Sequence, residues 1–273
     1  MALGLNDIDE TQAPLIDHLV ELRGRLVRCV VALALGFCVG LYFADDVYGF
    51  LVRPLEAAFS PGEGKLIYTK LYEAFFVELK VALFAGFCMT FPIIANQLWA
   101  FVAPGLYAKE KKAFLPFLLA TPVLFISGAS LAYYVVMPTA FKWFIGFEGV
   151  TGGLELEALP AAGEYLSLVM QFILAFGISF LLPVLLLLLN RAGIVSRATL
   201  AGARRYIIVG VFALSAIITP PDPGSQLLLA LPLLLLFEGS LLIMRLTESR
   251  REAAEQTEGA DLEKAEADPK PAE

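Results

Sequence analysis

Two short polar stretches of the sequence each place one carboxylate among several cations. In residues 18–26, which have the pattern of an amphipathic helix start, Glu21 is followed by two arginines, and in residues 101–112 Glu110 lies among three lysines. A carboxylate of this kind can accept charge-assisted hydrogen bonds from a basic ligand. It can equally balance its basic neighbours on a solvated surface, and the charge pattern alone leaves both interpretations open.

A second set of polar side chains falls inside long apolar segments. A carboxylate or amide within a bilayer is unfavourable unless it is paired or faces water, so each one is a candidate site. Glu238 lies seven residues before Arg245, and we expect it to be protonated or to face a polar cavity. Gln171 either belongs to a site or makes an ordinary hydrogen bond between helices. The other members of the set are Glu78, Lys80, Asn96 and Gln97.

The sequence lacks the sets of residues, in the right number and spacing, that several other chemistries need. One histidine, His18, cannot build a multi-histidine metal site or a haem with two imidazole ligands. The three cysteines form no CxxC pair and fit small apolar side chains. Residues 62–65 resemble the end of a phosphate-binding loop, but Phe59 stands where that loop requires glycine. Because hydrolase motifs are also missing, we expect a protein that is not an enzyme and that binds no cofactor and no metal.

The elements that position these side chains are predicted to be membrane-spanning helices. The chain has 273 residues, of which 58% are hydrophobic and 17% charged, against about 25% charged in soluble domains. We therefore predict an all-α integral membrane protein with six transmembrane helices, the last two of them short. The fifth segment reaches only about 20 Å as a helix. The six segments are residues 26–43, 75–101, 114–137, 165–189, 206–218 and 227–244.

The distribution of charge predicts the orientation and the domain boundaries. Fifteen of the 20 lysines and arginines fall on one side of the predicted helices, and the basic side of a membrane protein faces the cytoplasm, so both termini are expected there. We divide the chain into a cytoplasmic amphipathic segment, 1–25, a six-helix transmembrane domain, 26–245, and an acidic tail, 246–273, expected to be disordered or loosely helical. No basic patch supports nucleic-acid binding.

Several motifs of the sequence occur together, in order, in one known family. With the segment 18–26, the sequence resembles the TatC family, the multi-spanning receptor of the twin-arginine, or Sec-independent, protein translocase. The similarity runs from about Pro14 to Arg245. The further matching residues are Phe91-Pro92, Gln97 to Phe101, Pro104 to Tyr107, Glu110 to Lys112, Tyr165 to Ser167, Phe176 to Phe180 with Pro183, and Thr219 to Asp222.

The resemblance implies a concave, cup-shaped bundle in the bacterial cytoplasmic (inner) membrane. Members of the family bind twin-arginine signal peptides and, with the single-span partners TatA and TatB, export folded proteins with the protonmotive force. Self-association and contact with membrane lipids are implied too. By the matching motifs, Glu21 and Glu110 receive the two guanidinium groups, while Arg23 and Phe101 shape the site. An arginine fork pairs bidentately with a carboxylate and a lysine does not, which suits two separated carboxylates.

The resemblance also assigns residues away from that site, with one departure. Pro54 and Asp222 match positions that the family uses structurally or in later steps. The family commonly has glutamate or glutamine two residues before the proline of the fourth helix, where this sequence has Leu181. Gln171, about three turns earlier, is our hypothesis for a polar contact with a partner helix.

One alternative function belongs to another class. An ion-coupled secondary transporter of a small solute would use Glu238 and Gln171 as a site in the middle of the membrane. Such transporters usually carry internal repeats and several polar groups at that depth, and the sequence has no detectable repeat. Its acids cluster instead at the cytoplasmic ends of the predicted helices.

Overall fold

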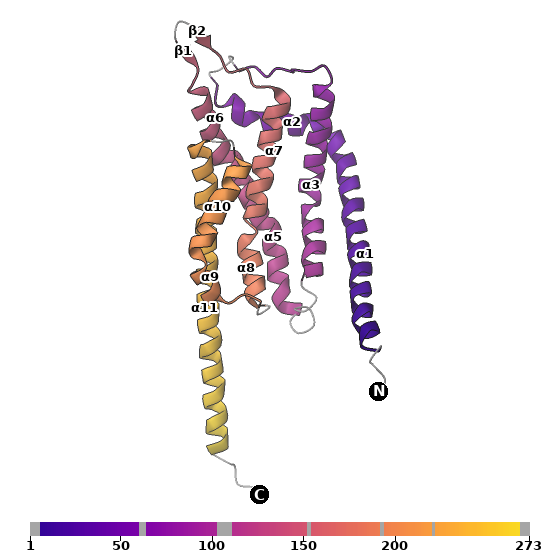
Figure 1. Cartoon of the computed structure of the whole chain (residues 1–273), viewed down its shortest axis with the longest axis vertical. Coiled ribbons are helices and arrows are strands. Elements are labelled where there is room, and N and C mark those ends of the chain that lie inside the picture. Colours follow the sequence, from indigo (N-terminus) through magenta and orange to yellow (C-terminus); the bar gives the residue numbers. More distant parts are fainter. Residues whose placement is uncertain are drawn as a thin grey trace.

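The computed structural model describes residues 6–59, 64–102, 111–151, 154–191, 194–219 and 222–267, and these are almost entirely helical (Figure 1). The long helices are α1 (Asn6–Tyr42), α3 (Glu73–Val102), α5 (Lys111–Leu131), α7 (Ala162–Ser179), α10 (Arg204–Ile218) and α11 (Pro223–Ala267). Shorter elements are α2 (Ala44–Glu56), the π-helix η1 (Ala132–Val136), α6 (Met137–Ile145), α8 (Leu182–Arg191) and α9 (Arg197–Gly202). The strands β1 (Gly149–Thr151) and β2 (Leu154–Leu156) form an antiparallel hairpin that composition did not predict.

Five of the described helical segments are long and apolar enough to cross a membrane. They are Leu19–Tyr42, Glu73–Phe101, Phe117–Ile145, Ala162–Asn190 and Pro223–Thr247. They confirm the prediction of a helical, multi-pass membrane protein. The third segment is longer than expected because α5 continues through η1 into α6. The predicted fifth span corresponds to α10, whose 15 residues extend about 22 Å, too short to count among the five.

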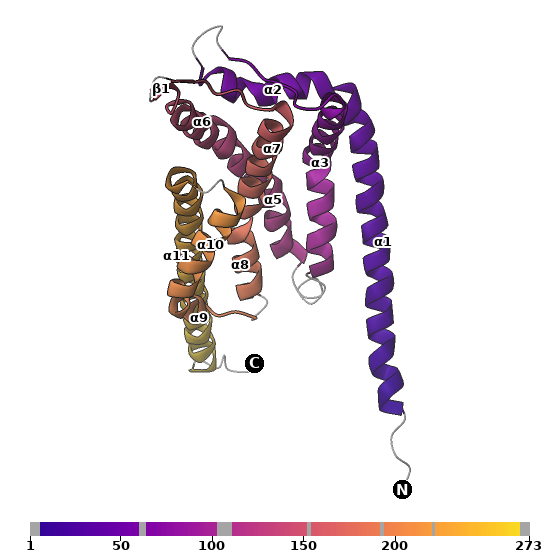
Figure 2. The same cartoon turned by 45° about the horizontal axis from the view of Figure 1, so that its top comes forward.

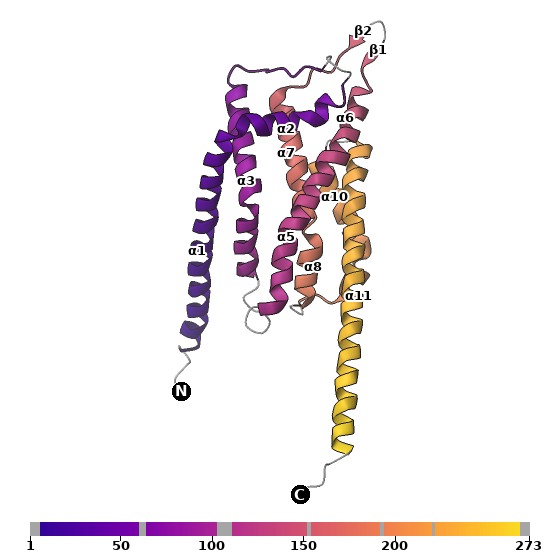
Figure 3. The same ribbon diagram turned by 180° about the vertical axis from the view of Figure 1, so that it is seen from behind.

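Both ends of the chain emerge at the same end of the bundle, as Figures 1 and 3 show. We call it the termini end. The opposite end, called the α2 end, carries α2 and the β-hairpin, and Figure 2 shows α2 lying across it. Two predicted boundaries fall inside helices. Helix α1 runs without interruption through residue 25. The tail was expected to be disordered or loosely helical. Helix α11 continues through it to Ala267, and Ala, Glu, Lys and Arg are good helix formers.

Helix α1 packs against α3 through glycines that bring the two backbones close together. A Cβ added to Gly36 would lie 2.7 Å from the carbonyl oxygen of Gly86, and one added to Gly40 would overlap the carbonyl oxygen of Ala82. Small residues allow this approach between membrane helices, where dispersion contacts drive association. The GxxxG pattern of Gly36 and Gly40 is therefore used in packing.

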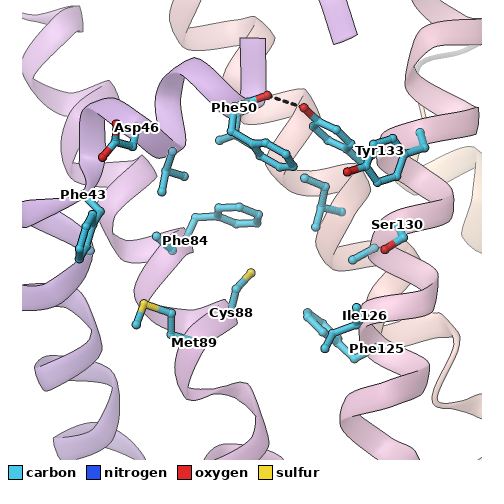
Figure 4. Close-up of a pocket in the computed structure, with 17 residues that line it drawn as sticks. Phe43, Asp46, Phe50, Phe84, Cys88, Met89, Phe125, Ile126, Ser130 and Tyr133 are labelled. Carbon is cyan, nitrogen blue, oxygen red and sulfur yellow. Dashed lines mark hydrogen bonds between the residues drawn. The ribbon is translucent and has the colours of Figure 1, made fainter. Parts of the chain in front are cut away.

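The core is centred on α7. Its fully buried side chains include Leu166, Phe172 and Phe176, which pack against η1, α2, α3 and α11. A second cluster nearer the termini end joins α3, α5 and α8, with the rings of Phe91 and Phe125 stacked at 3.8 Å. Between these clusters and under α2 lies an apolar cavity of about 570 Å³ (Figure 4).

Two tyrosines fasten α2 to the bundle. Pro54 lies inside α2 and has no N–H, so the carbonyl of Phe50, one turn earlier, lacks its helical donor. The hydroxyl of Tyr133 donates to that carbonyl oxygen at 2.6 Å, and its ring stacks on Phe50 at 4.2 Å (Figure 4). The hydroxyl of Tyr165 donates to the carbonyl oxygen of Leu51 at 2.8 Å. The proline thus opens an acceptor that another helix fills.

This arrangement predicts a coupling between Pro54 and Tyr133. Tyr133→Phe leaves the Phe50 carbonyl unpaired and should lower the free energy of unfolding by about 1–3 kcal/mol. In a Pro54→Ala background the loss should be smaller, because the alanine supplies a backbone N–H to the same carbonyl. Thermal unfolding of the four purified proteins in detergent measures the coupling. Tyr134→Phe, at an exposed neighbouring ring, is the control, and equal losses in both backgrounds would contradict the mechanism.

Candidate functional site

The register of α1 and α3 brings Glu21 level with Phe101 at the termini end. The two helices run in opposite directions, and Gly36 lies opposite Gly86 as Gly40 lies opposite Ala82. Each residue back along α1 is therefore matched by one residue forward along α3. Glu21 is fifteen residues before Gly36, and Phe101 is fifteen residues after Gly86, so with equal rise per residue they share one level.

The Glu21 carboxylate is held on the surface by its own helix. Its Oε1 accepts a hydrogen bond from Arg25 Nε at 3.0 Å and also contacts the terminal guanidinium nitrogen of Arg25. The Glu21 side chain is 41% exposed, and ion pairs this exposed contribute at most about 1 kcal/mol. Arg23 is exposed on the same helix. A basic ligand can therefore compete for Glu21 at little cost.

The end of α3 is fixed from the other side by α5. The indole nitrogen of Trp99 donates to Thr121 Oγ1 at 2.9 Å, and that hydroxyl donates to the carbonyl of Phe117 at 2.8 Å. Trp99 and Thr121 are buried, and Phe101 is half-buried two residues further on. Sequence reasoning missed the Trp99 bond, because its partner lies on another helix.

Gln97, one turn before Phe101, carries an open acceptor. Its Oε1 is buried and finds no hydrogen-bond donor among the described residues. Buried polar atoms are normally paired, so this one has room for a donor that the described residues do not supply. Sequence reasoning noted Gln97 as polar but assigned it no role.

Glu110, the second predicted carboxylate, lies outside the described residues. It follows the end of α3 by eight residues, and α5 begins at Lys111. The described residues therefore place Glu21, Arg23 and Phe101 at the same end of the bundle, and the pairing of Glu21 with Glu110 stays a prediction.

Glu238 and Gln171 do not form one site. Glu238 Oε2 accepts a hydrogen bond from Arg204 of α10 at 2.9 Å. The expectation that Glu238 is protonated or faces a polar cavity did not include this cation. Gln171 Nε2 donates to the carbonyl oxygen of Ile218 at 3.0 Å. Arg204 and Ile218 are the two ends of α10, about 20 Å apart. The transporter alternative thereby loses its predicted site.

Three of the predicted residues lie in packed regions or cap a helix: Pro54, Asp222 and Leu181. Pro54 is buried in α2, as described above. Asp222 is buried at the start of α11, where its Oδ2 accepts from the Ser225 backbone at 2.6 Å, an N-cap bond. Leu181, at the position where a polar residue was expected, is partly buried against the cluster that contains Phe91 and Phe125.

The α2 end contains a carboxylate that the sequence did not single out. Glu73 Oε1 accepts from the backbone of Gly163, in the first turn of α7, at 2.8 Å. Its Oε2 accepts from the Thr69 backbone and hydroxyl at 2.7 and 2.8 Å and from the Lys70 backbone at 3.2 Å. One side chain thus ties the segment before α3 to the start of α7. Only the folded arrangement reveals this, because Gly163 is 90 residues away.

Comparison with known proteins gives a consistent set of similarities. Residues 17–232 match the family model of the Sec-independent protein translocase protein (TatC). A protein of that name from Magnetococcus marinus is 49% identical over 254 residues, 92% of each chain. The Escherichia coli protein of that name is 39% identical over 231 residues, 85% of this chain and 87% of the other. A crystal structure of the twin arginine translocase receptor TatC in DDM matches with a TM-score of 0.74 and 39% identity, covering 83% of this chain and 98% of the other.

Proposed function

This chain belongs to the TatC family of Sec-independent protein translocase proteins, and we propose that it is the receptor and scaffold subunit of the twin-arginine translocase. In this proposal the termini end faces the cytoplasm and binds signal peptides that carry two adjacent arginines. With the single-span partners TatA and TatB, and by self-association, the protein then passes folded cargo across the bacterial inner membrane, driven by the protonmotive force.

The observation that carries this proposal is the level shared by Glu21 and Phe101. It gives a basic peptide an exposed carboxylate and a half-buried aromatic ring at the same end of the bundle. A guanidinium pairs bidentately with a carboxylate and stacks on aromatic faces, whereas an ammonium is a compact point charge. Glu110 is proposed as the carboxylate for the second arginine, and Arg23 as a neighbour that helps to shape the site.

The proposed orientation follows from charge. The termini end carries Arg23, Arg25, Arg204 and Arg205 among its exposed or half-exposed residues, and basic loops stay in the cytoplasm. Counting α10 as a span gives six, with both termini inside, around a concave face. Because α10 is about 22 Å long, we propose that the bilayer thins beside it, at fractions of a kcal/mol per Å.

The remaining predicted residues are assigned supporting roles. Pro54 shapes α2, and Asp222 caps α11 at the turn that follows α10. Glu238 holds α11 to α10 through Arg204. Gln171, which already joins α7 to α10, keeps its Oε1 available and is proposed to offer it to a partner helix.

Binding of a twin-arginine signal peptide to the purified protein tests the proposal. Fluorescence anisotropy in detergent should give saturable binding, and replacing both arginines with lysines should weaken it at least about tenfold, since each bidentate pair lost removes a charge-assisted hydrogen bond. A scrambled peptide of equal charge is the control. Equal affinity for the arginine and lysine peptides would refute a receptor of this specificity.

A further inference from the structure

A groove of about 620 Å³ lies between α3 and α7, with Leu33 of α1 at its edge. We call it the α3–α7 groove. It lies beside the cavity in Figure 4, and Phe84 of α3 lines both. Most of its lining is apolar, including Leu83, Phe87, Met170 and Leu174, and three polar side chains join them, Lys80, Ser167 and Gln171.

Lys80 is the one cation in this lining, and its charge is unbalanced within the described part of the chain. Its Nζ lies 3.4 Å from Ser167 Oγ, at the limit for a hydrogen bond. The ion pairs found among the described residues, Glu21 with Arg25 and Glu238 with Arg204, do not include it. An ammonium in a membrane-spanning helix is unfavourable unless it meets an anion or reaches the headgroup layer. Among the described residues, the donors of Lys80 are therefore available to an anion.

The depth of Lys80 is that of α2. Ser167 is two residues after Tyr165, whose hydroxyl bonds to Leu51 of α2, and Lys80 contacts Ser167. Helix α2 lies across the end of the bundle (Figure 2) with two acidic residues in its first turn and a buried apolar side. A helix of this kind lies at the boundary between headgroups and acyl chains. Lys80 is thus placed at the level of lipid headgroups.

The groove changes character along its length. Its charged end, at Lys80 and Ser167, points to the α2 end, because both residues follow closely on the starts of α3 and α7. Further along the same helices, Phe87 and Leu174 extend the apolar lining toward the termini end. A positive charge at headgroup depth above an apolar channel complements an anionic head attached to a hydrocarbon chain.

We propose that the α3–α7 groove binds an anionic phospholipid, with one acyl chain in the apolar channel and the phosphate held by Lys80 Nζ. Lysine suits a phosphate as a point charge with three donors. The Ser167 hydroxyl donates to the carbonyl of Gly163 at 2.6 Å and so turns a lone pair, not a proton, to Lys80, which orients the ammonium. The proposal does not rest on the receptor role.

Native mass spectrometry of the purified protein with added lipid tests this site. Dioleoylphosphatidylglycerol should be retained in preference to dioleoylphosphatidylcholine, and Lys80→Gln should reduce that preference about tenfold, the equivalent of one charge-assisted bond. Lys80→Arg should keep it. Lys142→Gln, which removes an exposed lysine of α6, is the matched control and should leave it unchanged.

A second variant tests the acyl chain separately. Ala175→Phe fills the channel without touching the charge, and it should reduce retention of both lipids. An unchanged preference for phosphatidylglycerol in Lys80→Gln would overturn the proposal. Unchanged retention of both lipids in Ala175→Phe would overturn it as well. Competition by millimolar inorganic phosphate would overturn it in favour of a free-anion site. A photo-crosslinker at Leu83 that captures no lipid in the purified protein would overturn it too. If Lys80→Gln does not purify as a monodisperse protein, Lys80→Arg and Ala175→Phe decide.

Discussion

Glu21→Gln is expected to weaken the binding of a twin-arginine signal peptide by about 10- to 100-fold. The side chain keeps its size and its place on α1, and only the negative charge is lost, so the change removes charge-assisted hydrogen bonds worth about 1.5–3 kcal/mol. The peptide titration described above measures it. Because the Glu21–Arg25 pair is exposed, the folded state should lose at most about 1 kcal/mol.

Glu110→Gln extends this test to the second carboxylate. If Glu21 and Glu110 each hold one arginine, the two losses in binding free energy should add in the double variant, as for independent sites. Strong non-additivity would mean that both carboxylates act on one group. Glu164→Gln, at an exposed carboxylate in the first turn of α7, is the control. Normal binding by the double variant would remove the carboxylate assignment altogether.

Gly40→Leu is expected to separate α1 from α3 and to lower stability by more than the about 1–3 kcal/mol typical of overpacking. Even the first added atom would overlap the carbonyl oxygen of Ala82, which belongs to the backbone and cannot move aside. The effect should appear as a lower thermal midpoint in detergent. It should also lengthen the distance between spin labels placed at Glu21 and Phe101 in a background without Cys29, Cys38 and Cys88, as measured by pulsed electron spin resonance.

Gly24→Leu is the matched control for the α1–α3 contact. It lies on the same helix, and an added Cβ would meet no atom within 4 Å. Replacing glycine in a helix by a better helix former should, if anything, raise stability by about 0.5–1 kcal/mol. Equal destabilisation by the two changes would show that the helix tolerates no larger residue for a reason other than packing on α3.

The spanning helices could be predicted because their signal is local. An apolar run long enough to cross a bilayer is visible without knowing its neighbours, and the segment predicted over 75–101 corresponds to Glu73–Phe101. The tail shows the limit of this reasoning. Its lack of aromatic residues suggested disorder, yet its helix formers continue α11 to Ala267.

The interactions between helices could not be predicted, since their partners are far apart in the sequence. Glu238 and its partner Arg204 are separated by 34 residues, and Tyr133 and Phe50 by 83. Pro54 was expected to have a structural role, but its use, opening a carbonyl for a tyrosine of another helix, depends on how α2 lies over the bundle. Similarly, Glu21 and Phe101 were named from motifs, whereas their shared level follows from the glycine contacts.

The glycine contacts between α1 and α3 lie far from Glu21 along α1, so a small tilt of α1 at these contacts has a large effect at Glu21. Glu21 lies fifteen residues from Gly36, about 22 Å along the helix from that close contact. A tilt of about 10° at these contacts moves the carboxylate by about 4 Å over that length, more than a hydrogen bond tolerates. Small rotations at the glycines therefore translate into making or breaking contact at the carboxylate.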